Sequence, residues 1–372
     1  MDTAGAGSAG SASRTSSGAG GAAATQVDAF KPTGEPIAAG DKQWTWIAFP
    51  DSKCRDGSTA GISVSLNSSS KKLMLFLEGG GACFDAGTCA TNPATVASKM
   101  PASDMGVFDR SQTENPVRDW NFAYVPYCTG DVHMGDKEDV MVPGVAGVQQ
   151  FVGRRNLRAF LNRLVPTFAD AEQVLLTGVS AGGFGASANT EFVQWAFGSV
   201  PVVMIDDSGP AMSNKYLPSC LTDGYRTYWG LDKTIIKLCG SDCTQGGDYT
   251  IDYVKHLAKV APNTRAGLIE SNQDQVIRWF YGVGTNNGAN DCMGTLAKTP
   301  MDAMLFEEGL LDERKLLMSL FPNYGTYFPK ATQHTWLSGA SLYTATTGAE
   351  NVKMIDWVTG IIEGKPATHV GP

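Results

Sequence analysis

The feature that most constrains the fold is an apolar run that ends in a serine framed by glycines. Residues 174–179 read VLLTGV, and the chain continues through Ser180, Ala181 and Gly182 into a segment with helical periodicity. This order predicts a strand, a tight turn and a helix, and small neighbours allow such a turn to close. The serine hydroxyl then stands at the carboxyl edge of the sheet. We therefore expect Ser180 to be a nucleophile; the alternative is a glycine-rich helix start capped by this serine.

Similar apolar runs recur along the chain and alternate with helical segments. Buried parallel strands read as short runs that are apolar on both faces, so this order predicts an α/β fold with a doubly wound, mostly parallel sheet. We expect loop or lid insertions at 84–118 and 208–248, which are rich in turn-forming and polar residues. The strand-like runs are 73–77, 121–127, 174–179, 202–205, 266–269 and 325–328, and the helical segments are 148–165, 181–197, 249–260, 275–281, 301–320 and 351–362.

The first residues differ in composition from the rest of the chain. Of residues 1–25, 19 are Gly, Ala or Ser, and such a stretch cannot bury enough apolar surface to offset the entropy lost on ordering. We therefore expect residues 1–28 to form a disordered, flexible linker and residues 29–372 to form a single catalytic domain.

The charge pattern argues against several kinds of partner. The chain has 29 Lys and Arg against 37 Asp and Glu, which leaves a net charge of −8. Nucleic-acid binding needs a basic face that neutralises phosphates, so we expect no nucleic-acid partner. A membrane span needs about 18 or more consecutive apolar residues, and the sequence has no such run. We expect a monomer without a membrane span.

Eight cysteines, an even number, are scattered through the body of the chain. They suggest up to four disulfides and an oxidising compartment, although many pairings are possible and none is assigned. A zinc site is not expected, because the closest cysteine pairs lack the CxxC spacing and only four histidines exist to complete one. We expect a secreted, cell-surface or periplasmic protein whose export signal has been removed from this chain.

Only four histidines are available to act as a base for Ser180. On a fold with this turn, the partners follow in the order serine, acid, histidine. Three histidines are unsuitable, because one precedes the serine, one falls inside a helical segment and one lies near the C-terminal end, where a fixed geometry is hard to hold: His133, His256 and His369. We expect the fourth, His334, to be the general base rather than an ordinary loop histidine.

Two places compete for the acid that orients His334. Asp274 lies in the loop after the strand-like run 266–269, where the acid of such a fold is usually found, and is the first choice. Asp207 and Glu270 are the alternatives. The run from Asp206 to Gly209 can also serve simply to cap a turn or helix.

A third requirement is a set of N–H donors for the negative oxygen of a tetrahedral intermediate. Losing one such donor typically costs about 3 kcal/mol. Three glycines, 79–81, directly follow the apolar run 73–77 and leave backbone amides unobstructed. We expect the donors to be Gly80, Gly81 and the residue after the nucleophile, Ala181. A phosphate-binding loop is not supported, because no Gly-Lys-Ser/Thr follows the glycines.

In combination, these motifs resemble the pectin acetylesterase and Notum family of carboxylesterases. The resemblance covers about residues 40–360 and rests on segments in the family's order: LEGGGACF at 77–84, YVPYCTG at 124–130, GVSAGG at 178–183, DDSG at 206–209, the Asp274 loop with WFYG at 279–282, and HTW at 334–336. It implies an α/β-hydrolase fold without a metal or other cofactor. It also implies a triad of Ser180, Asp274 and His334, with amide donors at Gly80, Gly81 and Ala181.

The resemblance implies a serine carboxylesterase acting through an acyl-enzyme on Ser180. Family members remove acetyl groups from pectin, or a fatty acyl group from a signalling protein in animals, so the expected partner is an acylated carbohydrate or a small ester. Short acyl groups are the first expectation. Ala82 stands where plant members carry Trp, and a net charge of −8 would repel a polyanionic pectin. The alternatives are a broad or lipid-type deacylase with a longer acyl pocket, and a non-catalytic carbohydrate-binding module.

Overall fold

The computed structural model describes residue 1 and residues 30–97, 99–244, 247–283, 292 and 300–372. At its centre lies a nine-stranded sheet in the order β1-β2-β4-β3-β7-β8-β9-β10-β13. From β4 to β13 the neighbouring strands are parallel, whereas β1 and β2 form an antiparallel edge. The strands of this sheet are β1 Trp44–Lys53, β2 Thr59–Ser65, β3 Lys72–Leu77, β4 Asn121–Val125, β7 Gln173–Val179, β8 Val202–Asp207, β9 Arg265–Ile269, β10 Tyr324–Tyr327 and β13 His369–Val370.

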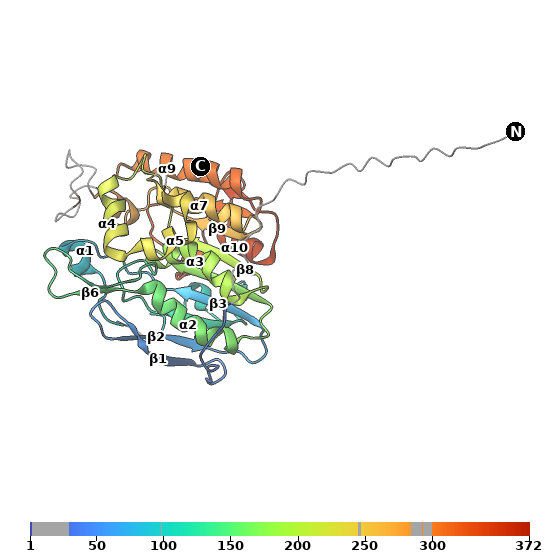
Figure 1. Ribbon diagram of the computed structural model, residues 1–372. Coiled ribbons are helices and arrows are strands. Elements are labelled where there is room, and N and C mark those ends of the chain that lie inside the picture. Colours follow the sequence, from blue (N-terminus) through green and yellow to red (C-terminus); the bar gives the residue numbers. More distant parts are fainter. Residues whose placement is uncertain (2–29, 98, 245–246, 284–291, 293–299) are drawn as a thin grey trace.

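Helices cover both faces of this sheet (Figure 1). Successive residues of β3 point to opposite faces, so Leu73 and Leu75 pack with α2 and α3, while Met74 and Phe76 pack in the core that contains α10. The sheet is therefore buried on both sides, as its apolar runs require. The helices are α1 Ala86–Thr91, α2 Gly153–Thr167, α3 Ala181–Phe197, α4 Ser219–Trp229, α5 Ile235–Cys239, α6 Ser241–Thr244, α7 Tyr249–Val260, α8 Ile277–Tyr281, α9 Ala303–Leu320 and α10 Met354–Glu363.

The shorter elements complete the described part of the fold. Two small antiparallel pairs lie outside the main sheet, and three turns are 3₁₀ helices. These elements are β5 Lys137–Val140 with β6 Gln149–Phe151, β11 Thr346–Thr347 with β12 Val352–Lys353, and the 3₁₀ helices η1 Gly106–Phe108, η2 Leu231–Lys233 and η3 Ala340–Tyr343.

The expected α/β fold with a mostly parallel sheet is confirmed, and the six expected strands are all present with small shifts at their ends. The helix expected over 148–165 begins only at Gly153, because residues 149–151 pair with β5 as a strand. The helix start is fixed by Asp131, whose carboxylate accepts a hydrogen bond from the Gly153 N–H at 2.7 Å. Likewise, the last helix begins at Met354 rather than at Asn351, after the short strand β12.

The expected insertions contain more regular structure than their composition suggests. The segment 84–118 holds α1, which begins at a capping box formed by Asp85 and Thr88. The segment 208–248 holds α4, α5 and α6, so it is an insertion with helices of its own. The expected linker falls almost wholly on residues 2–29, which lie outside the described residues.

The eight cysteines form four disulfides: Cys54–Cys128, Cys83–Cys89, Cys220–Cys292 and Cys239–Cys243. The expectation of up to four disulfides is confirmed, and such density is typical of proteins that mature in oxidising compartments. In the part of the chain that the structure describes, no helix combines the length and the apolar character that crossing a membrane requires.

Candidate active site

Ser180 occupies the tight turn between β7 and α3. Its backbone has φ 57° and ψ −121°, a conformation that costs energy in a non-glycine residue. The turn is possible because Gly182 has no side chain: a Cβ there would lie 1.9 Å from the Leu77 carbonyl oxygen. The Ser180 N–H donates to the Asp207 carbonyl at 2.7 Å, which ties the turn to β8. This is the geometry expected of a nucleophile elbow.

His334 and Asp274 lie together at the carboxyl ends of β10 and β9. The Nδ1 atom of His334 is 2.7 Å from Oδ2 of Asp274, and the Asp274 side chain is fully buried. The other oxygen of Asp274 accepts hydrogen bonds from the N–H groups of Val276 and Ile277 at 2.7 and 2.8 Å. The carboxylate is therefore fixed by its own loop and aimed at the imidazole. This is the contact that an acid orienting a general base would make.

The loops that carry these two side chains are joined along their length. Backbone N–H groups of the Asp274 loop donate to carbonyls of the His334 loop at three successive places. The side chain of Ser271 adds a bridge, since it donates to the Gln333 carbonyl at 2.6 Å and accepts from the Trp336 indole at 3.1 Å. The three backbone pairs are Asn272 to Pro329, Gln273 to Ala331, and Gln275 to Thr332, at 3.0, 3.2 and 3.2 Å.

Asp207, one of the two alternative acids, accepts hydrogen bonds from the backbone next to His334 and not from the imidazole ring. Its Oδ2 accepts hydrogen bonds from the N–H groups of Trp336 and Leu337, both at 2.7 Å. Burial raises the pKa of Asp207 to about 6, against the opposing effect of these N–H donors. The structure thus gives Asp207 a role in placing the His334 loop, and the neighbouring Ser208 hydroxyl also accepts the Thr335 N–H at 3.2 Å.

Glu270, the other alternative acid, is fully buried at the end of β9. No hydrogen bond joins it to His334 among the described residues, and neither of its carboxyl oxygens has a hydrogen-bond partner there. Burial raises the pKa of Glu270 well above its usual value, and the nearby carboxylates of Asp274, Asp207 and Asp206 add to the effect.

No hydrogen bond joins Ser180 to His334 among the described residues, although both side chains line one open pocket. Catalytic contacts of this kind are often long without substrate and tighten when it binds.

The other histidines lie elsewhere: His256 is buried in α7 beside Glu191, and His369 contacts Thr326 from β13. The sequence argument that a fixed geometry is hard to hold at His369 was wrong, since this residue belongs to the main sheet.

The three glycines after β3 lie directly beside the nucleophile. A Cβ at Gly79 would be 3.0 Å from the Ser180 Cβ, and a Cβ at Gly80 would be 2.6 Å from the Tyr127 ring. Gly81 has φ +80°, a conformation that favours glycine. Within the described residues, no backbone hydrogen bond engages the N–H groups of Gly80 and Gly81. Ala181 is the first residue of α3, where an N–H has no partner within the helix.

Two buried side chains hold this glycine loop, and the sequence analysis did not identify either. The Asn92 amide donates to the Gly80 carbonyl at 2.7 Å, and Nε2 of His133 is 2.9 Å from the Glu78 carbonyl. His133 is 3% exposed, and burial lowers its pKa to about 4, so the ring is neutral and donates through Nε2. His133 was set aside because it precedes Ser180, and the sequence offers no signal for Asn92.

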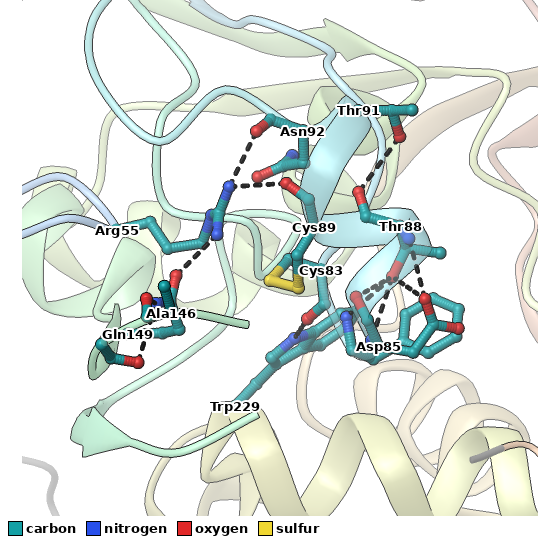
Figure 2. The surroundings of a disulfide bond; sticks show 12 residues. Arg55, Cys83, Asp85, Thr88, Cys89, Thr91, Asn92, Ala146, Gln149 and Trp229 are labelled. Carbon is teal, nitrogen blue, oxygen red and sulfur yellow. Dashed lines mark hydrogen bonds between the residues drawn. A yellow bond between two sulfur atoms is a disulfide. The ribbon is translucent and has the colours of Figure 1, made fainter. Parts of the chain in front are cut away.

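A disulfide also holds the end of the same loop. Figure 2 shows Cys83, at the end of the glycine loop, bonded to Cys89 in α1. Arg55 donates to the carbonyls of Cys89 and Asn92, both at 2.8 Å, and the Trp229 indole donates to the Cys83 carbonyl at 2.9 Å. The segment from residue 83 to residue 92 is therefore fixed to the body of the protein, and with it the amide of Asn92.

Ser180 stands between two pockets. One is the open pocket that also holds His334, with Glu78, Tyr124 and Ser338 among its lining residues. The other is a largely apolar cavity, which Ala82 also lines. Its walls come mainly from α3, α4, α7, α8 and the segments between them: Phe184, Met212, Leu217, Trp229, Leu231, Ile235, Tyr249, Tyr253, Val254, Ile277, Phe280 and Tyr281. The expected insertion 208–248 thus builds much of this cavity.

In the part of the chain that the structure describes, no three His, Cys, Asp or Glu side chains are grouped so that they could hold a metal ion. The triad expectation for Ser180, Asp274 and His334, and the donor expectation for Gly80, Gly81 and Ala181, remain predictions about role.

Fold and site geometry together define an α/β hydrolase. A model of the family described as Pectinacetylesterase matches residues 45–248, which is more than half of the chain. The chain belongs to this family, and the expectation drawn from the sequence motifs is confirmed.

Relatives and solved structures agree with this assignment. Palmitoleoyl-protein carboxylesterase notum2 of Xenopus laevis is 34% identical over 150 residues, 38% of this chain and 30% of its own length. The mouse palmitoleoyl-protein carboxylesterase NOTUM is 31% identical over 182 residues, 44% of this chain and 34% of its own length. The chain therefore spans about a third of these relatives. The structure of the Wnt deacylase Notum from Drosophila has a TM-score of 0.64 at 18% identity, covering 88% of this chain and 95% of that one.

The family and these relatives are named for the hydrolysis of carboxylic esters, which agrees with the class of enzyme expected from the sequence.

Proposed function

We propose that this protein is a serine carboxylesterase that forms an acyl-enzyme on Ser180. The observation that carries the proposal is the position of a strained Ser180 beside a histidine that is held by a buried carboxylate, with glycine amides on its other side. In the proposed reaction, the Ser180 Oγ attacks the ester carbonyl while His334 takes its proton.

The tetrahedral intermediate then places its negative oxygen toward the amides of Gly80, Gly81 and Ala181. His334 returns the proton to the departing alcohol, which leaves Ser180 acylated. A water molecule, deprotonated by His334, then attacks the acyl carbonyl; the bond to the Ser180 Oγ breaks, His334 returns the proton to this oxygen, and the carboxylic acid leaves. Asp274 stabilises the imidazolium formed in each step, and no metal is needed.

The two pockets at Ser180 divide the substrate between them. The open pocket contains Glu78, Tyr124 and Ser338, whose polar groups suit a hydroxyl-rich leaving group such as a sugar. The apolar cavity suits the acyl chain. Its many apolar and aromatic walls favour an acyl chain longer than acetyl, so the longer-acyl alternative is supported by a specific feature. An acetylated polysaccharide such as pectin remains the second candidate, supported by the family and by the open leaving-group side.

The test is ester hydrolysis against acyl length, from acetyl to palmitoyl p-nitrophenyl esters, with wild type, Ser180→Ala and Ala82→Trp side by side. Ser180→Ala is expected to lose activity by at least about a thousandfold on every ester. Full activity in Ser180→Ala would overturn the nucleophile assignment.

Acyl preference decides between the two substrate candidates. A wild-type optimum beyond acetyl, moved back toward acetyl by Ala82→Trp, supports the apolar cavity as the acyl site, because an indole at position 82 would fill it. A steep preference for acetyl in wild type would overturn the longer-acyl proposal and lead to acetylated pectin as the next substrate.

We also propose that the protein acts outside the cytosol, because its four disulfides would be reduced there. Thiol titration of natively produced protein tests this, and eight reactive thiols would contradict it.

A further inference from the structure

Glu270 is a buried carboxyl that the reaction above does not use. It is the first residue after β9, its backbone N–H donates to the Tyr327 carbonyl at 3.1 Å, and its side chain is fully buried. Neither carboxyl oxygen receives a hydrogen bond from any described donor. An ionised carboxylate in such a place would be both desolvated and unpaired, which is strongly unfavourable.

The charged groups that act on Glu270 are themselves acids. They are Asp206 and Asp207 at the end of β8 and Asp274 in the loop that follows Glu270 itself. Tyr281 of α8 is the nearby neutral group, and Glu313 of α9 lies beyond it next to Asp206. Among the described residues, the charged groups that act most strongly on this side chain are thus three acids, so the neutral acid is the form that the site accommodates.

Asp274 can accept about one more hydrogen bond. Its Oδ1 already accepts two N–H groups, and its Oδ2 accepts one hydrogen bond, from His334. Each carboxylate oxygen can accept about two hydrogen bonds. Asp274 is the acid that acts most strongly on the buried Glu270 carboxyl, which lies four residues before it in the chain, and two ionised carboxylates would have no proton to share.

We propose that Glu270 is a protonated carboxylic acid that donates a hydrogen bond to Asp274 and so positions the acid of the triad. The inference rests on the proposed role of Asp274. Glu270 acts through Asp274 and touches no substrate, so it is a positioning residue. A neutral donor at this place satisfies the last lone pair of Asp274 without adding a second negative charge behind the imidazole.

The first experiment compares the pH dependence of kcat/KM for wild type, Glu270→Gln and Glu270→Leu. Gln is neutral, has the same shape and can donate its amide hydrogen to Asp274. Glu270→Gln is therefore expected to keep kcat/KM within about threefold and to leave the midpoint of the acid limb in place. Glu270→Leu removes the donor and is expected to lower kcat about tenfold and to move that midpoint upward, because the carboxylate charge is then less dispersed and favours the imidazolium.

Two kinetic outcomes would overturn the proposal. If Glu270→Gln moves the acid limb downward by about half a pH unit or more, Glu270 carries a negative charge in the native enzyme. If Glu270→Gln and Glu270→Leu change activity equally, the hydrogen bond to Asp274 has no part in positioning it.

An infrared measurement keeps the proposal testable if Glu270→Leu does not fold. The difference spectrum of wild type minus Glu270→Gln at neutral pH is expected to contain a protonated-carboxyl carbonyl band, and its absence would overturn the proposal. This readout does not depend on turnover. Failure of the proposed function would appear instead as Ser180-independent hydrolysis, with the infrared band unchanged.

Discussion

The two sides of Ser180 are held in place by different means. On the acid–base side, the loops 270–276 and 329–337 continue the parallel pair β9 and β10 and are joined by three successive backbone hydrogen bonds. On the donor side, the glycine loop 78–83 has a backbone hydrogen bond only near each end, from Glu78 to the Val125 carbonyl and from Cys83 to the Gly130 carbonyl, and its middle is held by Asn92, His133 and a disulfide. The acid–base side therefore has several successive backbone supports, whereas the middle of the glycine loop depends on a few individual groups.

The histidines of the two sides, His334 and His133, also differ in their exposure and in their hydrogen-bond partners. His334 is partly exposed, with its side chain 17% accessible, and is paired with a carboxylate that can stabilise its charged form. His133 is buried against a backbone carbonyl, its ring centre lies 4.8 Å from that of the tilted Tyr127 ring, and burial keeps it neutral. The same residue type thus serves as a proton acceptor on one side and as a fixed hydrogen-bond donor on the other.

The largest effect on kcat is expected when the two aspartates of the acid–base side, Asp274 and Asp207, are each replaced by Asn and compared. Asp274→Asn should lower kcat by about 10⁴, because an amide would hold His334 in the wrong tautomer. Asp207→Asn should lower it by less than about tenfold, because the amide oxygen can still accept the Trp336 and Leu337 N–H groups. Steady-state kinetics of the two variants on one ester checks this. A loss in Asp207→Asn as large as that in Asp274→Asn would return Asp207 to consideration as the acid.

A smaller effect is expected from His133, which should make the free energy of unfolding depend on pH. Its pKa in the folded state is about 4, below the ordinary value of 6.5, because burial disfavours the charged ring. Between these values the unfolded chain binds a proton that the folded protein does not, so this residue lowers stability as the pH falls from about 6.5 to about 4. The total contribution is about 3 kcal/mol.

Chemical denaturation of wild type and His133→Gln at pH 7.5 and pH 4.5 tests this. Gln can still donate to the Glu78 carbonyl but does not titrate, so its stability should fall less over this range. The buried acids are common to both proteins and cancel in the comparison. Parallel losses in the two proteins would show that His133 does not contribute.

Sequence alone predicted the acid–base side better than the donor side. The elbow at Ser180, the loop acid Asp274 and the loop histidine His334 each follow an apolar strand, and such strands are visible as continuous apolar runs. The elimination of histidines by chain order selected His334, and the structure places it against Asp274. The role of each in the reaction stays a prediction.

The supports of the donor side could not be predicted, because they come from residues distant in sequence that no local pattern connects. Asn92 meets Gly80 only because the Cys83–Cys89 disulfide and Arg55 fold the segment 83–92 back. The antiparallel edge strands β1 and β2 were also not predicted; residues of β1 alternate poorly and are largely half-exposed.

The smallest effect is expected from removing one side-chain hydrogen bond on the donor side and comparing it with the same change on the acid–base side. Asn92→Leu removes the one side-chain donor to the Gly80 carbonyl, so the donor loop should lose its fixed position and kcat should fall about tenfold, with KM little changed. The acid limb of the pH profile should not move, because the acid–base side is untouched.

The matched control lies on the acid–base side. Asn272→Leu removes a comparable hydrogen bond, from the Ala331 N–H to the Asn272 side chain at 3.1 Å, but the backbone bonds between these loops remain and water can reach the half-buried Ala331. Its kcat should fall less than about threefold. Equal losses in Asn92→Leu and Asn272→Leu would mean that the two sides are equally dependent on single side chains, because the number of supports would then make no difference to the reaction.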